Sequence, residues 1–129
     1  MIDDVIKPTA APGLRAYVIW LPILPDDSAA AAAHAAARSA EPRVSHYWDP
    51  DRALGEELGK ALALPSREAG HTSGVAWDVY LLFERGTRWG AAPAFWMHQL
   101  DDVPATTAPR LSTPALRARL NALLAKATR

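Results

Sequence analysis

Apolar residues gather into short runs that prolines, glycines and acidic residues separate. The run at 14–21 ends in Val-Ile-Trp-Leu without alternation, which is typical of a strand buried on both faces. A second run at 43–48 alternates enough to predict another strand. The strongest strand candidate is 75–83, which is rich in β-branched and aromatic residues.

Three helices are predicted around these strands. The alanine-rich segment 27–39 follows an Asp-Asp-Ser series at 26–28, whose oxygens and negative charges suit the free amides of a first helical turn. At 49–51 the sequence is Asp-Pro-Asp, which is typical of a helix start: an N-cap, a proline at the first helical position and an acid in the first turn. This start predicts a helix that continues to about Leu62. A Thr-Pro pair opens a final amphipathic helix at 113–126.

The remaining segments connect these elements. Residues 84–87 predict a hairpin turn into a short strand at 87–89. The apolar segment 94–100 is interpreted as either an extra strand or a packed loop. Residues 1–13, with two prolines and no clear period, predict an extended N-terminal arm.

The resulting order of elements is β-α-β-α-β-β-α. A helix joins the first two strands, as a right-handed parallel crossover requires, and a hairpin with a terminal helix completes the set. We therefore expect one α/β domain over 14–129, with a central mixed sheet of about four strands flanked by helices.

Composition narrows the function classes. The 14 basic and 14 acidic residues of this 129-residue chain cancel, so no overall field favours nucleic acid or an anionic membrane. No apolar stretch approaches the roughly 20 residues that span a bilayer. The acidic N-terminus lacks the basic region of a signal peptide, so we expect a cytoplasmic protein. Nothing in the sequence predicts an oligomeric state.

The end of the first predicted strand carries a resemblance to a known family. Thioredoxin-like proteins have Trp-Cys-x-x-Cys at this place, and here Trp20 is followed by Leu21 and Leu24 at the two cysteine positions. The order of elements over 14–126 also resembles the thioredoxin fold. The resemblance implies a thioredoxin-like architecture.

Two departures from that family change the expected function. The chain has no cysteine, and thiol–disulfide exchange requires a thiolate. The resemblance also implies a proline before the third core strand, whereas residues 70–75 read Gly-His-Thr-Ser-Gly-Val. We therefore expect a non-redox member that acts as a binding or interaction module without a cofactor.

The expected binding surface is the edge at the first strand-helix junction. In the thioredoxin-like topology, the loop before the third strand faces this junction. A protein or peptide is the expected partner. The candidate binding residues are Leu21, Pro22, Leu24, Asp26, Asp27, His71 and Trp96.

A metal-assisted hydrolase is the alternative hypothesis. Asp26, Asp27 and His71 could together hold a divalent ion, with Asp78 or His98 as general acid or base. Helix capping explains the two neighbouring aspartates without any ligand. No pair of histidines has a metal-binding spacing, so such a site would have to assemble through tertiary structure.

Two further positions have competing interpretations. Asp78 lies inside the strongest predicted strand, where an acid needs a partner or lines a cleft; Arg43, Arg88 and Tyr47 are possible partners. The cluster at 95–98, Phe-Trp-Met-His, either closes the core or exposes a surface for a partner. The same question applies to all five tryptophans.

Overall fold

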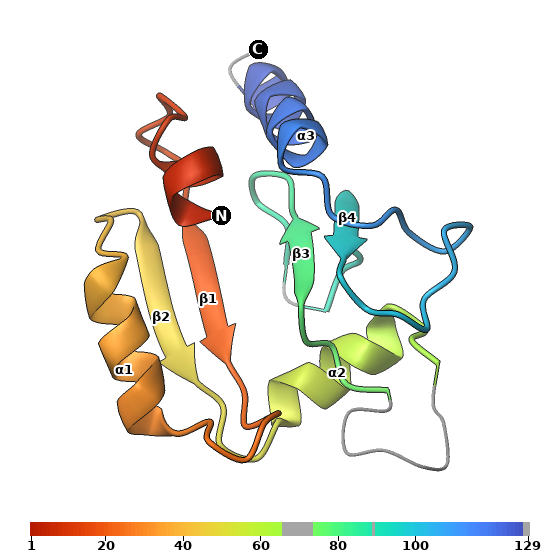
Figure 1. Cartoon of the computed structure of the whole chain (residues 1–129). Helices are drawn as coiled ribbons and strands as arrows, with labels where there is room; N and C mark the ends of the chain where they lie inside the picture. Colours follow the sequence, from red (N-terminus) through yellow and green to blue (C-terminus); the bar gives the residue numbers. More distant parts are fainter. Residues whose placement is uncertain (66–73, 89, 128–129) are drawn as a thin grey trace.

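The computed structural model describes residues 1–65, 74–88 and 90–127. Within them the elements follow the predicted order β-α-β-α-β-β-α, after a short helical turn at the N-terminus (Figure 1). The protein is therefore mixed α/β. The elements are η1 (Ile2–Ile6), β1 (Ala16–Trp20), α1 (Ala29–Arg38), β2 (Val44–Trp48), α2 (Ala53–Ala61), β3 (Val79–Leu82), β4 (Phe95–His98) and α3 (Thr113–Ala127).

The first sheet consists of β1 and β2. They run parallel, with Ala16 opposite Val44 and Trp20 opposite Trp48. Parallel neighbours need a crossover connection, and α1 provides it. The side chains of both strands are half-buried or exposed and none is fully buried, so this sheet lies outside the main core.

The N-terminal arm is helical at its start rather than extended throughout. Residues 2–6 form one π-helical turn, and Val5 within it is only 1% exposed. The hydroxyl of Thr9 donates to the carbonyl oxygen of Val5 over 2.6 Å, which fixes the chain just after the turn. Burial of Val5 explains why this segment folds back onto the domain.

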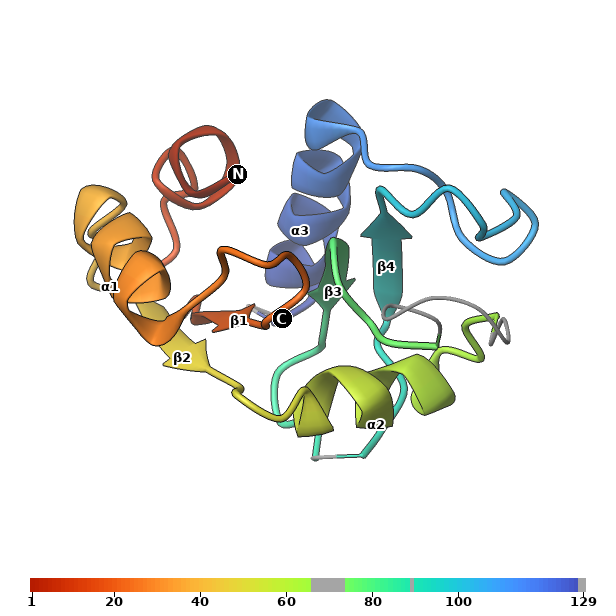
Figure 2. The ribbon, with the colours of Figure 1, turned by 60° about the horizontal axis from the view of Figure 1, so that its bottom comes forward.

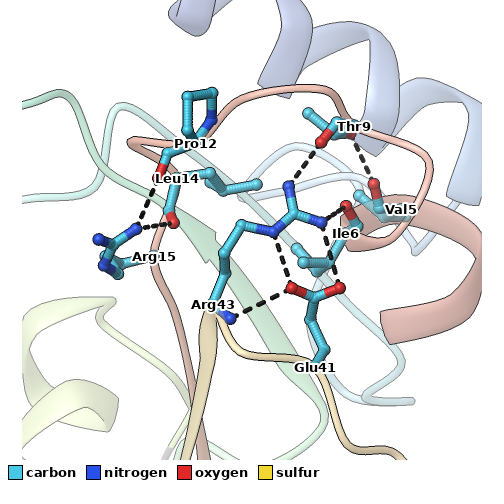
Figure 3. Close-up of polar contacts among 8 residues, drawn as sticks. All are labelled: Val5, Ile6, Thr9, Pro12, Leu14, Arg15, Glu41 and Arg43. Carbon is cyan, nitrogen blue, oxygen red and sulfur yellow. Dashed lines mark hydrogen bonds and ion pairs between the residues drawn. The ribbon is translucent and has the colours of Figure 1, made fainter.

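Arg43 fastens the arm to the turn that precedes β2 (Figure 3). Its guanidinium donates to the carbonyl oxygens of Thr9 at 2.6 Å and Ile6 at 2.8 Å. The same group binds the Glu41 carboxylate through Nε at 2.8 Å and Nη2 at 3.2 Å. A planar guanidinium has enough donors in one plane to make all four bonds, which an ammonium group could not do.

The second helix begins later than the sequence predicts. Asp49 is its capping side chain, but Pro50 lies in a turn before the helix instead of at its first position. Arg52 has a left-handed backbone with φ of 59°, and the helix starts after it. This turn lets one carboxylate reach the amides of Ala53, Leu54 and Gly55.

The second sheet is the antiparallel pair β3–β4, with Val79 opposite His98 and Leu82 opposite Phe95. The predicted strand at 75–83 is confirmed only for residues 79–82; its first four residues and Phe83 are not in the strand. Asp78 has a φ of 49°, a left-handed conformation that ends an extended strand. Residues 75 and 76 are buried outside any strand, so their apolar character reflects core packing.

The partner of β3 also differs from the predicted hairpin. A turn at 84–87 is present, with the Thr87 amide bonded to the Glu84 carbonyl at 3.2 Å and Gly86 at φ of 81°. Residues 87 and 88 are not a strand, and residue 89 lies outside the described residues. The strand that returns is β4, which confirms the strand interpretation of 94–100.

The main core lies where β4, the loop after it and α3 meet. The Ser112 hydroxyl accepts a hydrogen bond from the Ala115 amide at 3.4 Å and caps α3. The cap therefore lies one residue before the predicted Thr-Pro pair. Arg119 of this helix lies over the Phe95 ring, 5.0 Å from its centre. Buried apolar residues of this region are Met97, Leu100, Val103, Ala108, Leu116 and Leu120.

The predicted single sheet of about four strands is replaced, within the described residues, by two two-stranded sheets. The strands nevertheless lie in the spatial order β2, β1, β3, β4, with β3 antiparallel to β1 (Figure 1). Figure 2 shows α1 and η1 on one side of the strands and α2 on the other. The chain just before Asp78 is bonded to α2 instead of extending β3, and β1 and β3 do not pair.

Candidate functional site

The junction after β1 is a closed loop that presents one large apolar side chain. The Asp27 carboxylate accepts from the amides of Ile23 at 2.9 Å and Leu24 at 2.6 Å. The Asp27 amide in turn donates to the Leu24 carbonyl oxygen at 3.0 Å. These bonds hold the loop while the Leu24 side chain remains 64% exposed.

The capping residues predicted for α1 divide their roles. Ser28 is the N-cap and accepts from the Ala31 amide at 3.2 Å. Asp27 closes the preceding loop, and Asp26 is exposed. Ser28 therefore caps α1, whereas the sequence predicts that Asp26 and Asp27 also take part in the cap.

The inner side of the junction packs against α2. Leu21 is half-buried, and a methyl group placed on Gly55 of α2 would overlap the Leu21 side chain and approach Val75 within 2.9 Å. Leu21 and Val75 therefore both lie against the same glycine. The amide of Ala76 donates to the Gly55 carbonyl at 2.8 Å, which joins the chain before β3 to this helix.

The described residues contain no cluster of side chains that supports the metal hypothesis. His71 lies outside them, and no group of three or more metal-binding side chains occurs in residues 1–65, 74–88 and 90–127. Asp27 has its carboxylate bonded to two backbone amides, as described above. Asp26 and Asp27 alone do not make a metal site.

Asp78 is not the buried acid of a central strand. It is exposed and lies just before β3, while its expected partner Arg43 is bonded to Glu41. Its neighbour Tyr80 is affected: burial, and next the charge of Asp78, raise the pKa of the Tyr80 hydroxyl. The Gln99 side-chain amide donates to that hydroxyl at 2.8 Å.

His98 is a structural residue of the core. Its side chain is fully buried, and its Nδ1 accepts from the Leu100 amide at 3.1 Å. That bond leaves the proton on Nε2, which lies 3.1 Å from the Ala108 carbonyl oxygen and donates to it. Trp96 is half-buried with its ring 5.9 Å from the imidazole. This cluster closes the core, with Trp96 at its margin.

A pair that the sequence does not single out lies on the first sheet. The Trp20 indole donates to Nδ1 of His46 at 3.2 Å, and the two rings are 6.0 Å apart. Nε2 of His46 is buried and has no hydrogen-bond partner in the described part of the chain. Position alone could have signalled the pair, because parallel pairing brings the two strands together with both residues on one face.

None of the family models, curated proteins and solved structures compared with this chain gives a match. Its function is therefore inferred from its own residues. None of the helices in the described residues combines the length and apolar composition that a membrane crossing needs. At the junction the chain presents the exposed Leu24 side chain on a hydrogen-bonded loop beside the carboxylates of Asp26 and Asp27.

Proposed function

We propose that this protein is a non-redox interaction module of thioredoxin-like architecture, which binds a protein or peptide at the junction after β1. The observation that carries the proposal is the projecting Leu24 on a loop closed by Asp27. Preorganised loops lose little conformational entropy on binding, and an exposed leucine gains by burial. Leu21 supports the loop from beneath through its contact with α2.

The spatial order of the strands supports the proposed architecture. With β2, β1, β3 and β4 side by side and β3 antiparallel to β1, pairing of β1 with β3 would give one four-stranded mixed sheet (Figure 1). The placement of α1 and α2 on opposite sides of the strands agrees with such a layered fold (Figure 2).

The absence of thiols limits the chemistry of the proposed module. Leucines at 21 and 24 cannot form the mixed disulfide through which a thioredoxin acts. The same positions are chemically suited to van der Waals contact, which is why we propose recognition rather than turnover. The metal-assisted hydrolase is not proposed, because no described cluster of ligands favours it.

Site-specific photocrosslinking tests the proposal. A benzophenone amino acid replaces Leu24 in one variant and Ala33, an exposed residue of α1, in the control. We expect discrete adducts in cells from position 24 and not from position 33. The same set of adducts from both positions would contradict a binding surface at the junction.

The captured partner then allows a quantitative test. Leu24→Asp should weaken its binding by about tenfold or more, since it removes an apolar contact and places a charge in the interface. Phe83→Asp is the matched control, because Phe83 is 44% exposed and directly follows β3, at the end of that strand away from the junction. Equal losses in both variants would indicate a nonspecific hydrophobic contact instead.

A further inference from the structure

The outer edge of β2 is unpaired in the described residues. β2 pairs with β1 alone, and it is the outermost strand of the array (Figure 1). The ladder begins with the Ala16 amide on the Arg43 carbonyl and ends with the Asp49 amide on the Trp20 carbonyl, each at 2.9 Å. Alternate residues of a parallel strand point their peptide groups to opposite edges.

It follows that the peptide groups of Ser45 and Tyr47 face β1, together with the carbonyl of Arg43 and the amide of Asp49. The peptide groups of His46 and Trp48, and the carbonyl of Val44, point away from it. The Val44 amide is bonded to the Glu41 carbonyl at 2.9 Å. The edge thus offers an alternating row of donors and acceptors, which another strand can pair with.

The sequence of β2 carries none of the usual protection of a free edge. Val-Ser-His-Tyr-Trp has no lysine, acid, proline or glycine, whereas natural edge strands are commonly blunted by such residues. Parallel sheets are normally covered on both faces, and two strands alone are marginally stable. The Tyr17 and Tyr47 side chains on one face remain 63% and 54% exposed.

We propose that β2 pairs antiparallel with β2 of a second copy of this chain, around a two-fold axis at His46. This inference does not depend on the proposed function, because it uses another edge of the molecule. In this register Ser45 faces Tyr47 of the second copy, so a small side chain meets a large one. The two sheets become one continuous sheet.

The charges at the two ends of β2 are already engaged within the chain, Arg43 with Glu41 and Asp49 with the first amides of α2. The antiparallel orientation therefore rests on the match of Ser45 with Tyr47 across the two-fold axis. The formal net charge of the chain is 0, so two copies do not repel each other.

The pairing would also extend the aromatic face. Tyr17 and Tyr47 already contact each other with ring centres 6.4 Å apart. Across the two-fold axis, the Tyr47 side chains of both copies lie on the same face of the joined sheet, diagonal to each other. Cross-strand aromatic neighbours of this kind stabilise sheets.

Analytical ultracentrifugation of the full chain tests the proposal. We expect a concentration-dependent dimer for the natural sequence. The double variants Ser45→Lys/Tyr47→Lys and Ser45→Glu/Tyr47→Glu should each dimerise about tenfold or more weakly, because like charges then face each other twice. An equimolar mixture of the two should restore the dimer. Both positions are exposed, and circular dichroism verifies that the variants fold.

Two controls fix the place and the register. Tyr17→Lys changes the same face on β1, away from the outer edge, and should leave dimerisation unchanged. Ser45→Lys mixed with Tyr47→Glu should associate more strongly than Ser45→Lys mixed with Ser45→Glu. A natural chain that stays monomeric at every soluble concentration overturns self-pairing, as does a dimer that the double variants leave intact; in the first case the edge would serve a strand from another protein.

Discussion

Gly59 of α2 lies so close to Gly74 that a methyl group on its α-carbon would overlap the Gly74 carbonyl oxygen. Gly55, one turn earlier, lies similarly close to Leu21 and Val75. Both glycines are buried in the helix. Since glycine is costly in a helix, close approach of the backbone before β3 is the physical reason for their presence.

Gly59→Ala should destabilise the protein even though alanine favours helices by about 1 kcal/mol. Displacing the backbone at Gly74 is expected to cost about 3 kcal/mol, which leaves a net loss of about 2 kcal/mol. Chemical denaturation measures it. Gly13→Ala is the control, because a methyl group on Gly13 would have no atom within 4 Å, and this variant should be neutral or slightly stabilising.

Acid should weaken the attachment of the N-terminal arm. Hydrogen bonds from Arg43 hold the pKa of Glu41 below its ordinary value of 4.5. The folded state then binds fewer protons than the unfolded state, so this contribution is complete above pH 4.5 and is lost as pH falls through the lowered pKa. Stability profiles of the natural chain and Glu41→Gln should therefore converge in acid.

The control for that measurement is Glu57→Gln. Glu57 pairs with Lys60 at 3.4 Å on the surface, and both side chains are more than two-thirds exposed. Exposed pairs contribute little to folding, so its profile should follow the natural chain at every pH. Parallel profiles for Glu41→Gln and the natural chain would contradict the role assigned to Glu41.

Removal of the His98 ring should destabilise the core. His98→Phe preserves much of the volume but leaves the Leu100 amide and the Ala108 carbonyl without partners. The expected loss is about 3 kcal/mol in denaturant unfolding. The exposed His34 serves as the control, since His34→Asn should change stability by less than about 0.5 kcal/mol. If His98→Phe changed the free energy of unfolding as little as His34→Asn, the two buried hydrogen bonds of His98 would contribute nothing to stability.

Asp27→Ala should loosen the junction loop. The Leu24 amide loses its acceptor, and its hydrogen exchange should accelerate by about tenfold. The Ile23 amide loses Asp27 but keeps the Leu21 carbonyl oxygen at 3.0 Å, so its exchange should change less. Asp26→Ala, at the exposed neighbouring acid, should leave both amides unchanged. The Asp27 variant should also bind the partner captured at position 24 less tightly, because the loop is no longer preorganised.

Local signals account for the elements that the sequence predicts well. The run ending at Trp20, the cap at Ser28 and the carboxylate of Asp49 each act over a few residues. Their physical causes, burial and amide capping, are visible in a short window of sequence. The order of elements follows from them.

The errors arise where distant contacts decide. Val75 and Ala76 continue the apolar run of the predicted strand, but the Ala76 amide is bonded to Gly55 of α2, and Asp78 then turns the backbone. The partners of His98 lie in the loop that follows it, which no spacing rule identifies. The sequence predicts Leu24 as a binding residue, whereas its rigid presentation depends on bonds to Asp27 that the sequence does not reveal.

The bonds of Arg43 impose an order on folding during synthesis. They join Arg43 to Thr9 and Ile6, which lie 34 and 37 positions earlier in the sequence. The carbonyl oxygens of Thr9 and Ile6 therefore have no guanidinium to bind until residue 43 has been synthesised. Closing such a loop costs chain entropy until β2 exists to hold Arg43 in place. The bonds that fix the segment after the helical turn of residues 2–6 therefore form only once the chain has been made as far as β2.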